Sequence, residues 1–411
     1  MKSYNHLYEK YISDENIKLA IKNACKHKLK RRRFRELHDN PDKYINWIRE
    51  QATEFHNDHH TPIQIYDGIQ RKKRTIIVPS FREQIIHHMV VNIFKPIVMK
   101  PLYEHSYGSI PERGGTKGMK VIKKWLTHDY RNTKYCLKMD IRKYFDSVPH
   151  EIVIEKLKSQ IHDERFLSIL LEIINVNDKG LPLGFYTSQW LANWYLTGLD
   201  HYIKEELKAK HYIRYMDDMV IFDSNKRKLH KMRKLIENYL HDNLGLELKD
   251  NWQVFPIKSR FLDFMGYRFY RNKVTLRKSI IIKACRKVRR IARDKPTIYS
   301  IKQYLSYLGW FSQTDSYNAF RSRFSKDINI QTLKRRIADM TSAWQSCQGD
   351  YKPLGKFTRD DCTVIARNIK EVEDGIYQWE EYAMLTSDYD KLEEYFDKAE
   401  AAEILLGESE G

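Results

Sequence analysis

Hydrophobic residues recur with two different periods along the chain, which predicts an α+β fold. A period of three to four residues, typical of amphipathic helices, dominates residues 1–55 and 81–100. Short runs of β-branched and aromatic residues, typical of strands, lie between helical segments. Further helices are predicted at residues 190–199, 226–240, 280–295, 301–311, 330–344, 365–372 and 392–406. Strands are predicted at residues 63–68, 71–79, 135–140, 212–222, 244–249 and 261–267.

One strand-forming run, residues 212–222, contains two adjacent carboxylates, Asp217 and Asp218. This pattern predicts a hairpin with an acidic turn between two packed strands. Adjacent anions near buried strands raise each other's pKa unless a cation neutralises them, and a divalent metal ion is the expected partner. An ordinary surface turn is the alternative interpretation of the dipeptide taken alone.

A second strand-forming run ends at Asp140, after which Tyr144 and Phe145 introduce a helical pattern. We therefore expect Asp140 at the end of a strand. Two strands from distant parts of the chain would then bring three carboxylates together. Three hard oxygen donors suit Mg²⁺, which uses few protein carboxylates and completes its coordination with water and substrate phosphates.

The charge of the chain indicates a polyanionic partner. Its 411 residues include 73 Lys and Arg against 54 Asp and Glu, a net charge of +19. Residues 351–411 hold 7 basic and 16 acidic residues, so the first 350 residues hold 66 basic and 38 acidic ones, a net charge of +28. With 13% aromatic residues, this basic body is expected to bind nucleic acid.

Other compositional features indicate a cytoplasmic location. The sequence has no apolar run long enough to span a membrane and no apolar signal-peptide core. Its five scattered cysteines form no Cys-x-x-Cys pair, and we interpret them as reduced thiols rather than zinc ligands or disulfides. We therefore expect the protein to stay in the cytoplasm and to have no membrane partner.

Two clusters of basic residues are candidate nucleic-acid contacts. The first lies in the N-terminal helical region and comprises Lys30, Arg31, Arg32 and Arg33. The second lies on the helix predicted at residues 280–295 and comprises Arg286, Arg289 and Arg290. The other face of that helix is expected to bury Ala284, Val288 and Ile291. A solvated helix face is the alternative for any single basic run.

A hairpin predicted at residues 63–79 carries Arg71, Lys73 and Arg74 into its second strand, where they would reach the phosphates of a bound nucleotide. An edge strand protected by charge is the alternative. The following helix, residues 81–100, is expected to be limited by Pro96 and Pro101. A glycine-rich segment at residues 106–118 lacks the spacing of a P-loop but would let a nucleic-acid backbone approach closely.

Four segments, in this order, resemble the motif blocks of the reverse transcriptase family. They are Asp140 with its flanking strand and aromatic residues, Gly180-Leu-Pro-Leu-Gly-Phe-Tyr-Thr-Ser-Gln189, Tyr215-Met-Asp-Asp218 and Phe261-Leu-Asp-Phe-Met-Gly-Tyr267. The resemblance covers roughly residues 65–275 and implies a right-hand polymerase with fingers, palm and thumb. Its antiparallel palm sheet would carry the hairpin with Asp217 and Asp218, and its thumb would be mostly helical.

The same resemblance implies four regions. They are a basic N-terminal helical region at residues 1–60, fingers and palm at 61–275, a helical thumb at 276–346 and an acidic C-terminal extension at 347–411. The Gly180 block looks most similar to prokaryotic enzymes of diversity-generating retroelements and to related antiphage-defence reverse transcriptases of the unknown groups. At Leu183 the chain departs from group II intron enzymes, which usually have Gln there, and familiar retron signatures are not evident.

The resemblance also implies roles for individual residues. Asp140, Asp217 and Asp218 would hold two Mg²⁺ ions, for which Mn²⁺ could substitute, with a weak contribution from the backbone carbonyl of Ile141. Phe145 would exclude the ribose 2′ hydroxyl, so the product would be DNA. Further contacts to the incoming nucleotide or the primer are implied for Gln189, for Lys249 or Lys258, and for the primer-grip residues Phe264, Met265 and Gly266. A helix cap is the alternative for Ser188 and Gln189.

These observations predict an RNA-directed DNA polymerase that uses dNTPs and an RNA template to make cDNA. Two settings remain open: antiphage defence with a dedicated noncoding RNA, and a diversity-generating retroelement with an accessory protein. The acidic extension would suit an accessory protein or a homo- or hetero-oligomer. The alternatives are a catalytically silent RNA- or DNA-binding scaffold and a metal nuclease built on the same carboxylates.

Overall fold

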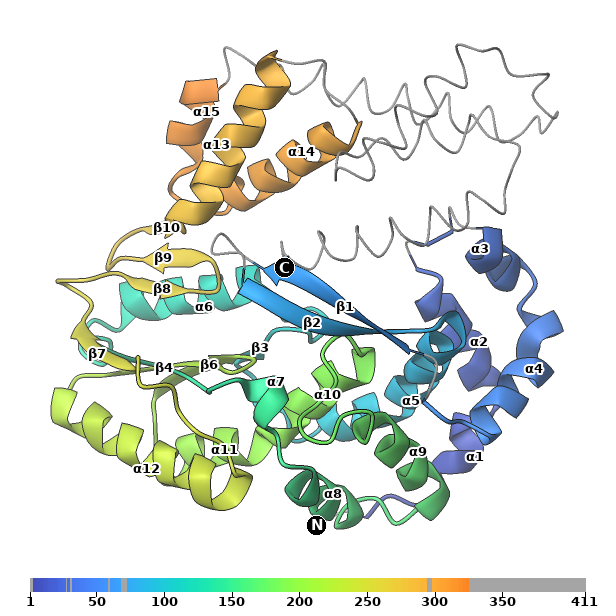
Figure 1. Cartoon of the computed structure of the whole chain (residues 1–411). Helices are drawn as coiled ribbons and strands as arrows, with labels where there is room; N and C mark the ends of the chain where they lie inside the picture. The colour runs from blue at the N-terminus through green and yellow to red at the C-terminus, as the bar shows by residue number, and fades with distance from the viewer. Residues whose placement is uncertain are drawn as a thin grey trace. The chain divides into compact units, whose positions relative to one another are not determined.

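The structure is a computed structural model that describes residues 3–26, 28–29, 32–57, 60–67, 72–293 and 298–324. Its helices are α1 (Leu7–Tyr11), α2 (Asp14–Ala24), α3 (Arg32–Asp39), α4 (Pro41–Thr53), α5 (Phe81–Met99), α6 (Gly115–His128), α7 (Tyr144–Ser147), α8 (His150–Lys158), α9 (Glu164–Ile174), α10 (Tyr186–Tyr195), α11 (Thr197–His201), the π-helix η1 (Tyr202–Glu206), α12 (Lys226–Leu244), α13 (Lys278–Arg293), α14 (Ile298–Ser312) and α15 (Tyr317–Phe324). Its strands are β1 (His60–Asp67), β2 (Lys72–Pro79), β3 (Ser106–Tyr107), β4 (Tyr135–Asp140), β5 (His211–Tyr215), β6 (Asp218–Asp223), β7 (Gln253–Pro256), β8 (Leu262–Phe264), β9 (Tyr267–Phe269) and β10 (Val274–Leu276). The predicted α+β fold is confirmed (Figure 1).

Contacts between residues divide the chain into two units. Unit 1 comprises Met1–Gln64, Thr75–Met265 and Phe269–Asn272, and unit 2 comprises Ile65–Arg74, Gly266–Arg268 and Lys273–Gly411, each as far as its residues are described. The boundary passes through the β1–β2 hairpin and through a three-stranded sheet of order β10-β9-β8. Within the described residues, no helix is long and apolar enough to cross a membrane.

A five-stranded sheet of order β3-β5-β6-β4-β7 forms the centre of unit 1. Its neighbouring strands are antiparallel, as predicted for a palm sheet, except that β3 pairs parallel with β5. Residues from Met219 to Phe222 of β6 are completely buried, so this strand is covered on both faces. Helix α12 packs against β4, β6 and β7 and covers one of these faces (Figure 1).

Helix α5 connects the helical parts of unit 1, because it packs against α2 on one side and α10 on another. A capping box begins it: the Ser80 side chain accepts from the Glu83 backbone N–H at 3.3 Å, and Glu83 accepts from the Ser80 N–H at 2.7 Å. The expectation that Pro96 limits this helix is wrong, since α5 continues through Pro96 to Met99. Burial of Ile97 and Val98 stabilises the last turn despite the proline.

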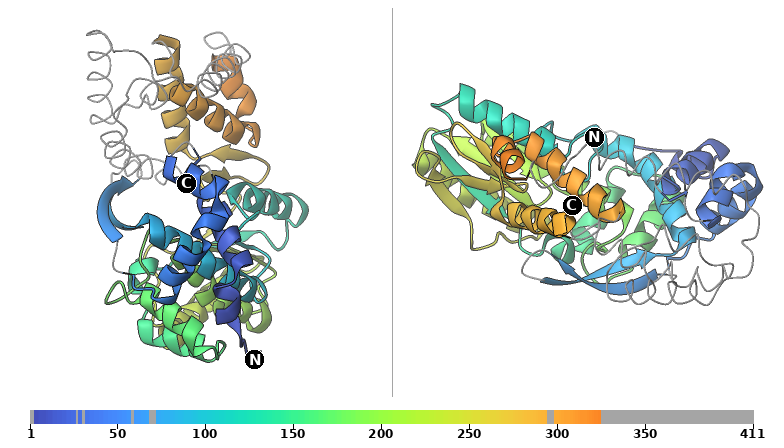
Figure 2. Two further views of the ribbon diagram at one scale, coloured as in Figure 1. Left: turned by 90° about the vertical axis from the view of Figure 1, so that its right-hand side faces the viewer. Right: turned by 90° about the horizontal axis from the view of Figure 1, so that it is seen from above.

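In unit 2, the described helices α13, α14 and α15 pack against one another in chain order (Figures 1 and 2). Ala284, Val288 and Ile291 form the buried side of α13, as predicted. The ring of Tyr267 stacks on Trp310 of α14 with 5.8 Å between centroids. The end of the β8–β9 hairpin that belongs to unit 2 is therefore anchored on α14.

The strand predicted at residues 244–249 is wrong. Helix α12 instead extends to Leu244 and ends at Gly245, which has a φ of +57°. Beyond it, Leu248 forms only an isolated bridge with Ile141, and the buried side chains of Leu246 and Leu248 account for the alternating pattern. The helices predicted at residues 330–344, 365–372 and 392–406, and the acidic extension, lie outside the described residues.

Candidate active site

Three carboxylates meet where the central strands end. Asp140 closes β4 and Asp218 opens β6, and the two residues are directly opposite in the antiparallel register. Asp217 lies in the turn between β5 and β6, and its carbonyl oxygen accepts from the Ile141 N–H at 3.4 Å. Opposed residues of antiparallel strands have Cβ atoms roughly 5 Å apart. The predicted acidic turn and the predicted position of Asp140 at a strand end are both confirmed.

The electrostatics of this cluster are unfavourable to three free anions. Burial, and after it the charges of Asp140 and Asp218, raise the pKa of Asp217 to about 7, with a contribution from a hydrogen bond to Asp140. The ammonium group of Lys249 forms an ion pair with the Asp140 carboxylate, and the Lys249 backbone N–H donates to the Asp140 carbonyl at 2.9 Å. The raised pKa of Asp217 and the ion pair between Lys249 and Asp140 both reflect the repulsion among these carboxylates.

A divalent cation would relieve the same repulsion. Within the described residues, no group of three or more His, Cys, Asp or Glu side chains is already spaced to hold a metal ion. The donor set still fits a hard cation, because all three side chains offer carboxylate oxygens. Asp217 would lose its proton and Asp140 would exchange Lys249 for the cation. The carbonyl of Ile141, an implied ligand, belongs to a residue that pairs with Leu248 beside this cluster.

A buried ion pair contacts the backbone of the acidic turn. Arg214 of β5 and Asp200 of α11 are both fully buried, and they are joined by bonds of 2.8 Å and 2.6 Å from the guanidinium to the carboxylate. Asp200 also accepts from the Tyr212 hydroxyl at 2.7 Å and from the Ser106 hydroxyl at 3.0 Å. The remaining guanidinium nitrogen donates to the carbonyl of Met216 at 3.0 Å. Arg214 therefore links the core of unit 1 to the residue that precedes Asp217.

The conformation of Met216 depends on this support. Met216 has a φ of +52°, an unfavourable value for a residue with a side chain. Its N–H donates to the Tyr107 carbonyl at 3.0 Å, and its sulfur accepts from the Asn193 amide at 3.3 Å. Gly108 leaves room for it, because a Cβ there would lie 2.8 Å from the Met216 Cγ. Hydrogen bonds that join Met216 to β3, α10 and Arg214 thus hold the strained turn in place.

The glycine-rich block packs against the segment that follows Asp140. The Leu181 N–H donates to the Phe145 carbonyl at 2.7 Å. Gly180 has a φ of +81°, and a Cβ there would lie 2.4 Å from the same carbonyl oxygen, so only glycine fits. Phe145 is partly buried, with its ring 5.7 Å from that of Tyr144. These contacts fix the position of Phe145 relative to Asp140.

Gln189 lies within α10 rather than at its start. Helix α10 begins at Tyr186 after Phe185, so the alternative of a helix cap at Ser188 and Gln189 is wrong. The Gln189 side chain accepts from the Ser109 hydroxyl at 2.9 Å and so contacts the loop that follows β3. The sequence does not mark the true start of the helix, because Phe185 at the N-cap position has no side chain that can cap it.

Other predicted site residues lie elsewhere. Phe264 is buried in β8, and Met265 and Gly266, with φ values of +51° and +80°, form the turn of the predicted primer-grip hairpin. Lys73 and Arg74 are exposed on β2 in unit 2. The exposed nucleic-acid candidates are Arg33 on α3 and Arg286, Arg289 and Arg290 on α13, while Arg32 begins α3. Lys30, Arg31 and Arg71 lie outside the described residues.

Sequence reasoning missed the support of the acidic turn. The sequence assigns no role to Arg214 or Asp200, although a charged residue inside the apolar run 212–222 indicates a buried partner. The choice between Lys249 and Lys258 was also left open. The structure places Lys249 against Asp140, whereas Lys258 is exposed beyond β7.

Curated relatives are about one quarter identical to this chain over part of its length. The chain is 25% identical over 247 residues to Protein YkfC of Escherichia coli strain K12, an overlap of 49% of this chain and 64% of that protein. It is 26% identical over 170 residues to the retron Ec73 reverse transcriptase of Escherichia coli, an overlap of 37% and 51%. The chain thus spans 64% of the length of the first of these relatives and 51% of the second.

Among solved structures, telomerase from Candida albicans, in complex with a fragment of telomeric RNA, is 10% identical and overlaps 84% of this chain and 69% of that chain at a TM-score of 0.44. The model of the family described as reverse transcriptase (RNA-dependent DNA polymerase) matches residues 64–269, half of the chain. This span contains all three carboxylates, Lys249 and the primer-grip hairpin. The chain therefore belongs to the reverse transcriptase family, as its motifs predict.

Proposed function

We propose that the chain is an RNA-directed DNA polymerase that extends a primer along an RNA template with deoxynucleoside triphosphates. The observation that carries this proposal is the convergence of Asp140, Asp217 and Asp218 at the ends of β4 and β6. Membership of the reverse transcriptase family supports the choice of an RNA template. The net charge of +28 over the first 350 residues supports a nucleic-acid substrate.

The three carboxylates would hold two Mg²⁺ ions, with Mn²⁺ as a substitute, and Asp140 and Asp217 would bind them most directly. When bound, the ions lower the pKa of the primer 3′ hydroxyl and neutralise the triphosphate and the departing pyrophosphate. The chain itself contributes alignment, because Arg214 and Asn193 fix the turn that carries Asp217.

Two further residues act on the incoming nucleotide. The Lys249 ammonium adjoins Asp140, so we assign to Lys249, and not to the exposed Lys258, the contact with the nucleotide phosphates. Phe145 is held next to the Asp140 strand by the Leu181 hydrogen bond. Its ring would clash with a ribose 2′ hydroxyl, which favours DNA as the product.

Primer extension tests this proposal. A DNA primer on an RNA template is incubated with dNTPs and Mg²⁺, and wild type is compared with Asp217→Asn/Asp218→Asn. The matched control is Asp242→Asn, because the Asp242 carboxylate is exposed on α12 and pairs with the exposed His241. We expect full-length cDNA from wild type and control and none from the double variant. Equal extension by the double variant would refute the assignment of the carboxylates.

The same assay separates the alternative functions. A catalytically silent scaffold would bind the primer–template without extending it in any variant. A metal nuclease would degrade nucleic acid without requiring dNTPs.

The biological setting is antiphage defence with an associated noncoding RNA or a diversity-generating retroelement with an accessory protein, in the cytoplasm in either case. The family match is to reverse transcriptases in general and does not distinguish the two settings. Sequencing the RNA that co-purifies with the chain, together with its cDNA, distinguishes them: a single noncoding template indicates defence, and a mutagenised repeat indicates a retroelement. Deletion of residues 351–411 tests whether the acidic extension binds a protein partner, since unchanged assembly would refute that role.

A further inference from the structure

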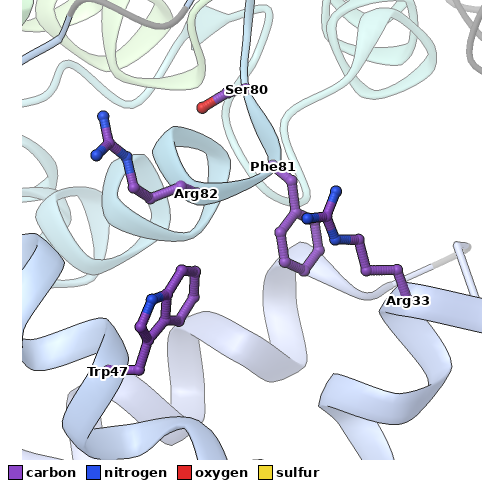
Figure 3. A pocket seen from close by; sticks show the side chains of 5 residues that line it. All are labelled: Arg33, Trp47, Ser80, Phe81 and Arg82. Atoms are coloured by element: carbon purple, nitrogen blue, oxygen red, sulfur yellow. The ribbon is translucent and has the colours of Figure 1, made fainter.

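A small open pocket lies in unit 1, outside the carboxylate site. It has a volume of about 230 Å³ and is lined by Arg33, Trp47, Ser80, Phe81 and Arg82. These residues come from three elements: Arg33 from α3, Trp47 from α4, and the other three from the start of α5 (Figure 3). None of them belongs to the catalytic machinery described above.

Exposed aromatic surface is the first chemical feature of this pocket. Trp47 is 41% exposed, although large aromatic side chains are usually covered. Its indole and the ring of Phe81 lie on two sides of the pocket (Figure 3). Phe81 is itself held by the ring of Phe34, whose centroid lies 4.9 Å away in an edge-to-face arrangement. The exposed Trp47 indole is therefore the surface of the pocket on which a planar ligand would stack.

Positive charge is the second feature. The guanidinium of Arg33 lies over the Phe81 ring, 4.8 Å from its centroid. Arg82 reaches the pocket with its guanidinium fixed by hydrogen bonds to the Gln51 side chain at 3.0 Å and the His56 carbonyl at 3.4 Å. Two guanidinium groups beside the exposed Trp47 ring match a ligand that combines a flat apolar ring with an anion.

The surrounding charges keep this pocket cationic. Glu83 is fully buried and engaged in the capping box with Ser80. Glu36, one turn after Arg33 on α3, accepts from the Lys43 ammonium and the Tyr44 hydroxyl in the first turn of α4. Lys28 adds a further cation near α3, with its ammonium 5.0 Å from the Phe34 ring centroid. The described residues that line the pocket are two arginines and three uncharged residues, so its lining is cationic.

We propose that this pocket binds an unpaired nucleotide of single-stranded RNA, with the base stacked on Trp47 and the phosphate bound by Arg33 and Arg82. Stacking on an aromatic ring beside cations is the general means by which proteins bind single strands without sequence preference. Trp47 and Arg33 are therefore RNA-binding residues of a site separate from the carboxylates. The identification of the ligand as RNA, rather than another single strand, rests on the proposed function.

The test measures binding of a fluorescent single-stranded oligouridine by anisotropy. Wild type is compared with Trp47→Ala, Trp47→Phe and Arg33→Gln in the full chain. The control is Tyr130→Ala, because Tyr130 is also exposed, at 54%, and also lies under an arginine, with the Arg271 guanidinium 4.7 Å from its ring centroid. Thermal unfolding of each variant verifies that the fold is retained.

We expect Trp47→Ala to weaken RNA binding about fivefold to 150-fold, which corresponds to the loss of one base–aromatic stack of ~1–3 kcal/mol. Trp47→Phe should retain most of the affinity, because a ring remains for stacking. Arg33→Gln should weaken binding and reduce its dependence on salt. Crosslinking with a 4-thiouridine oligonucleotide should label the peptide that contains Trp47 or Phe81.

Unchanged RNA affinity in Trp47→Ala, or crosslinks that all map away from α4 and the start of α5, would overturn the proposal. Primer extension by the same variants distinguishes it from the proposed function. If wild type extends primers while Trp47→Ala binds RNA normally, only the pocket assignment fails. If no variant extends primers but affinity depends on Trp47, the pocket stands and the polymerase proposal fails.

Discussion

At the scale of single residues, the position of Asp217 depends on the buried charge of Arg214. Arg214 is fully buried and divides its hydrogen bonds between Asp200 and the carbonyl of Met216. A buried ion pair of this kind contributes little net stability, because desolvation offsets the attraction. Its geometry, however, fixes a turn whose backbone is strained at Met216. We infer that Arg214 is a positioning residue for the catalytic turn.

Substitution of both partners separates positioning from stability. Arg214→Met alone leaves Asp200 buried without its partner and should lower the free energy of unfolding by about 3–5 kcal/mol. Arg214→Met combined with Asp200→Leu should recover most of that stability, since no buried charge remains unpaired. We expect the double variant to show kcat at least about tenfold below wild type in primer extension, with the KM for template unchanged. Wild-type kcat in a stable double variant would show that Arg214 serves stability alone.

Phe145 offers a prediction about sugar selection. Phe145→Ala should increase the incorporation of ribonucleotides relative to deoxyribonucleotides, because the ring that excludes the 2′ hydroxyl is removed. The measurement is the ratio of kcat/KM for the two nucleotide types at one template position. Tyr144→Phe is the control, since Tyr144 neighbours Phe145 but directs its hydroxyl to the Ala192 carbonyl at 2.6 Å. An unchanged ratio in Phe145→Ala would remove the gate assignment.

The carboxylates could be predicted from the sequence, whereas their support could not. Asp217 and Asp218 interrupt a strand-forming run, and Asp140 ends another, so local patterns reveal all three. Asp200 lies in a short helix and Asn193 in another, and neither position is marked by local periodicity. Their connection to Arg214 arises only when α10, α11 and β5 pack together, which is a property of tertiary structure.

At the scale of elements, the contact between α5 and α10 contains a buried histidine, His87, whose pKa is lowered. His87 is 1% exposed, its Nδ1 lies 2.9 Å from the Thr187 hydroxyl, and its ring centroid lies 4.5 Å from that of Phe185. Burial, with a smaller effect of His88, lowers the pKa of His87 to about 3. An unfolded histidine titrates near pH ~6.5. At pH values between these two pKa values, protonation of His87 therefore favours the unfolded chain.

The expected consequence is acid sensitivity. Because the unfolded chain binds the extra proton, His87 should make the free energy of unfolding fall by ~1.4 kcal/mol per unit as the pH decreases below about 6.5. His87→Gln keeps a hydrogen-bonding group for Thr187 but does not titrate, so the slope should decrease by about that amount. Urea denaturation at several pH values measures it, with the exposed His241→Gln as control. Equal slopes for His87→Gln and wild type would contradict the assignment.

Elements whose hydrophobic pattern fits one type of secondary structure could be predicted from the sequence. Elements whose pattern fits more than one type could not. The hairpin over residues 212–222, the strand before Asp140 and the buried face of α13 follow from short-range pattern alone. The apolar alternation at residues 244–249 is equally regular, but Leu244 belongs to α12, and the following segment pairs with the chain at the end of β4 only through the isolated bridge between Leu248 and Ile141. Alternation reports which side chains are buried and not which backbone groups pair.

At the scale of the whole molecule, both units carry candidate nucleic-acid contacts among their described residues. The carboxylates, Lys249 and the exposed Arg33 belong to unit 1, and the exposed arginines of α13 belong to unit 2. The acidic extension, which the charge distribution makes the most unusual part of the sequence, lies outside the described residues. Composition could predict a nucleic-acid partner for the body, because charge acts over long distances. It could not predict the pocket at Trp47, which depends on the packing of α3 and α4 against α5.

The central claim is that Asp140 and Asp217 act as one unit in nucleotidyl transfer. The most direct test is the single-turnover rate of first-nucleotide incorporation in Asp140→Asn, Asp217→Asn and the combined variant, with Asp242→Asn as control. We predict that each single variant is slower by at least about a thousandfold and that the combined variant is hardly slower still, because residues of one catalytic unit are not additive. A rate within about tenfold of wild type for Asp217→Asn, or two losses that multiply in the combined variant, would contradict the account.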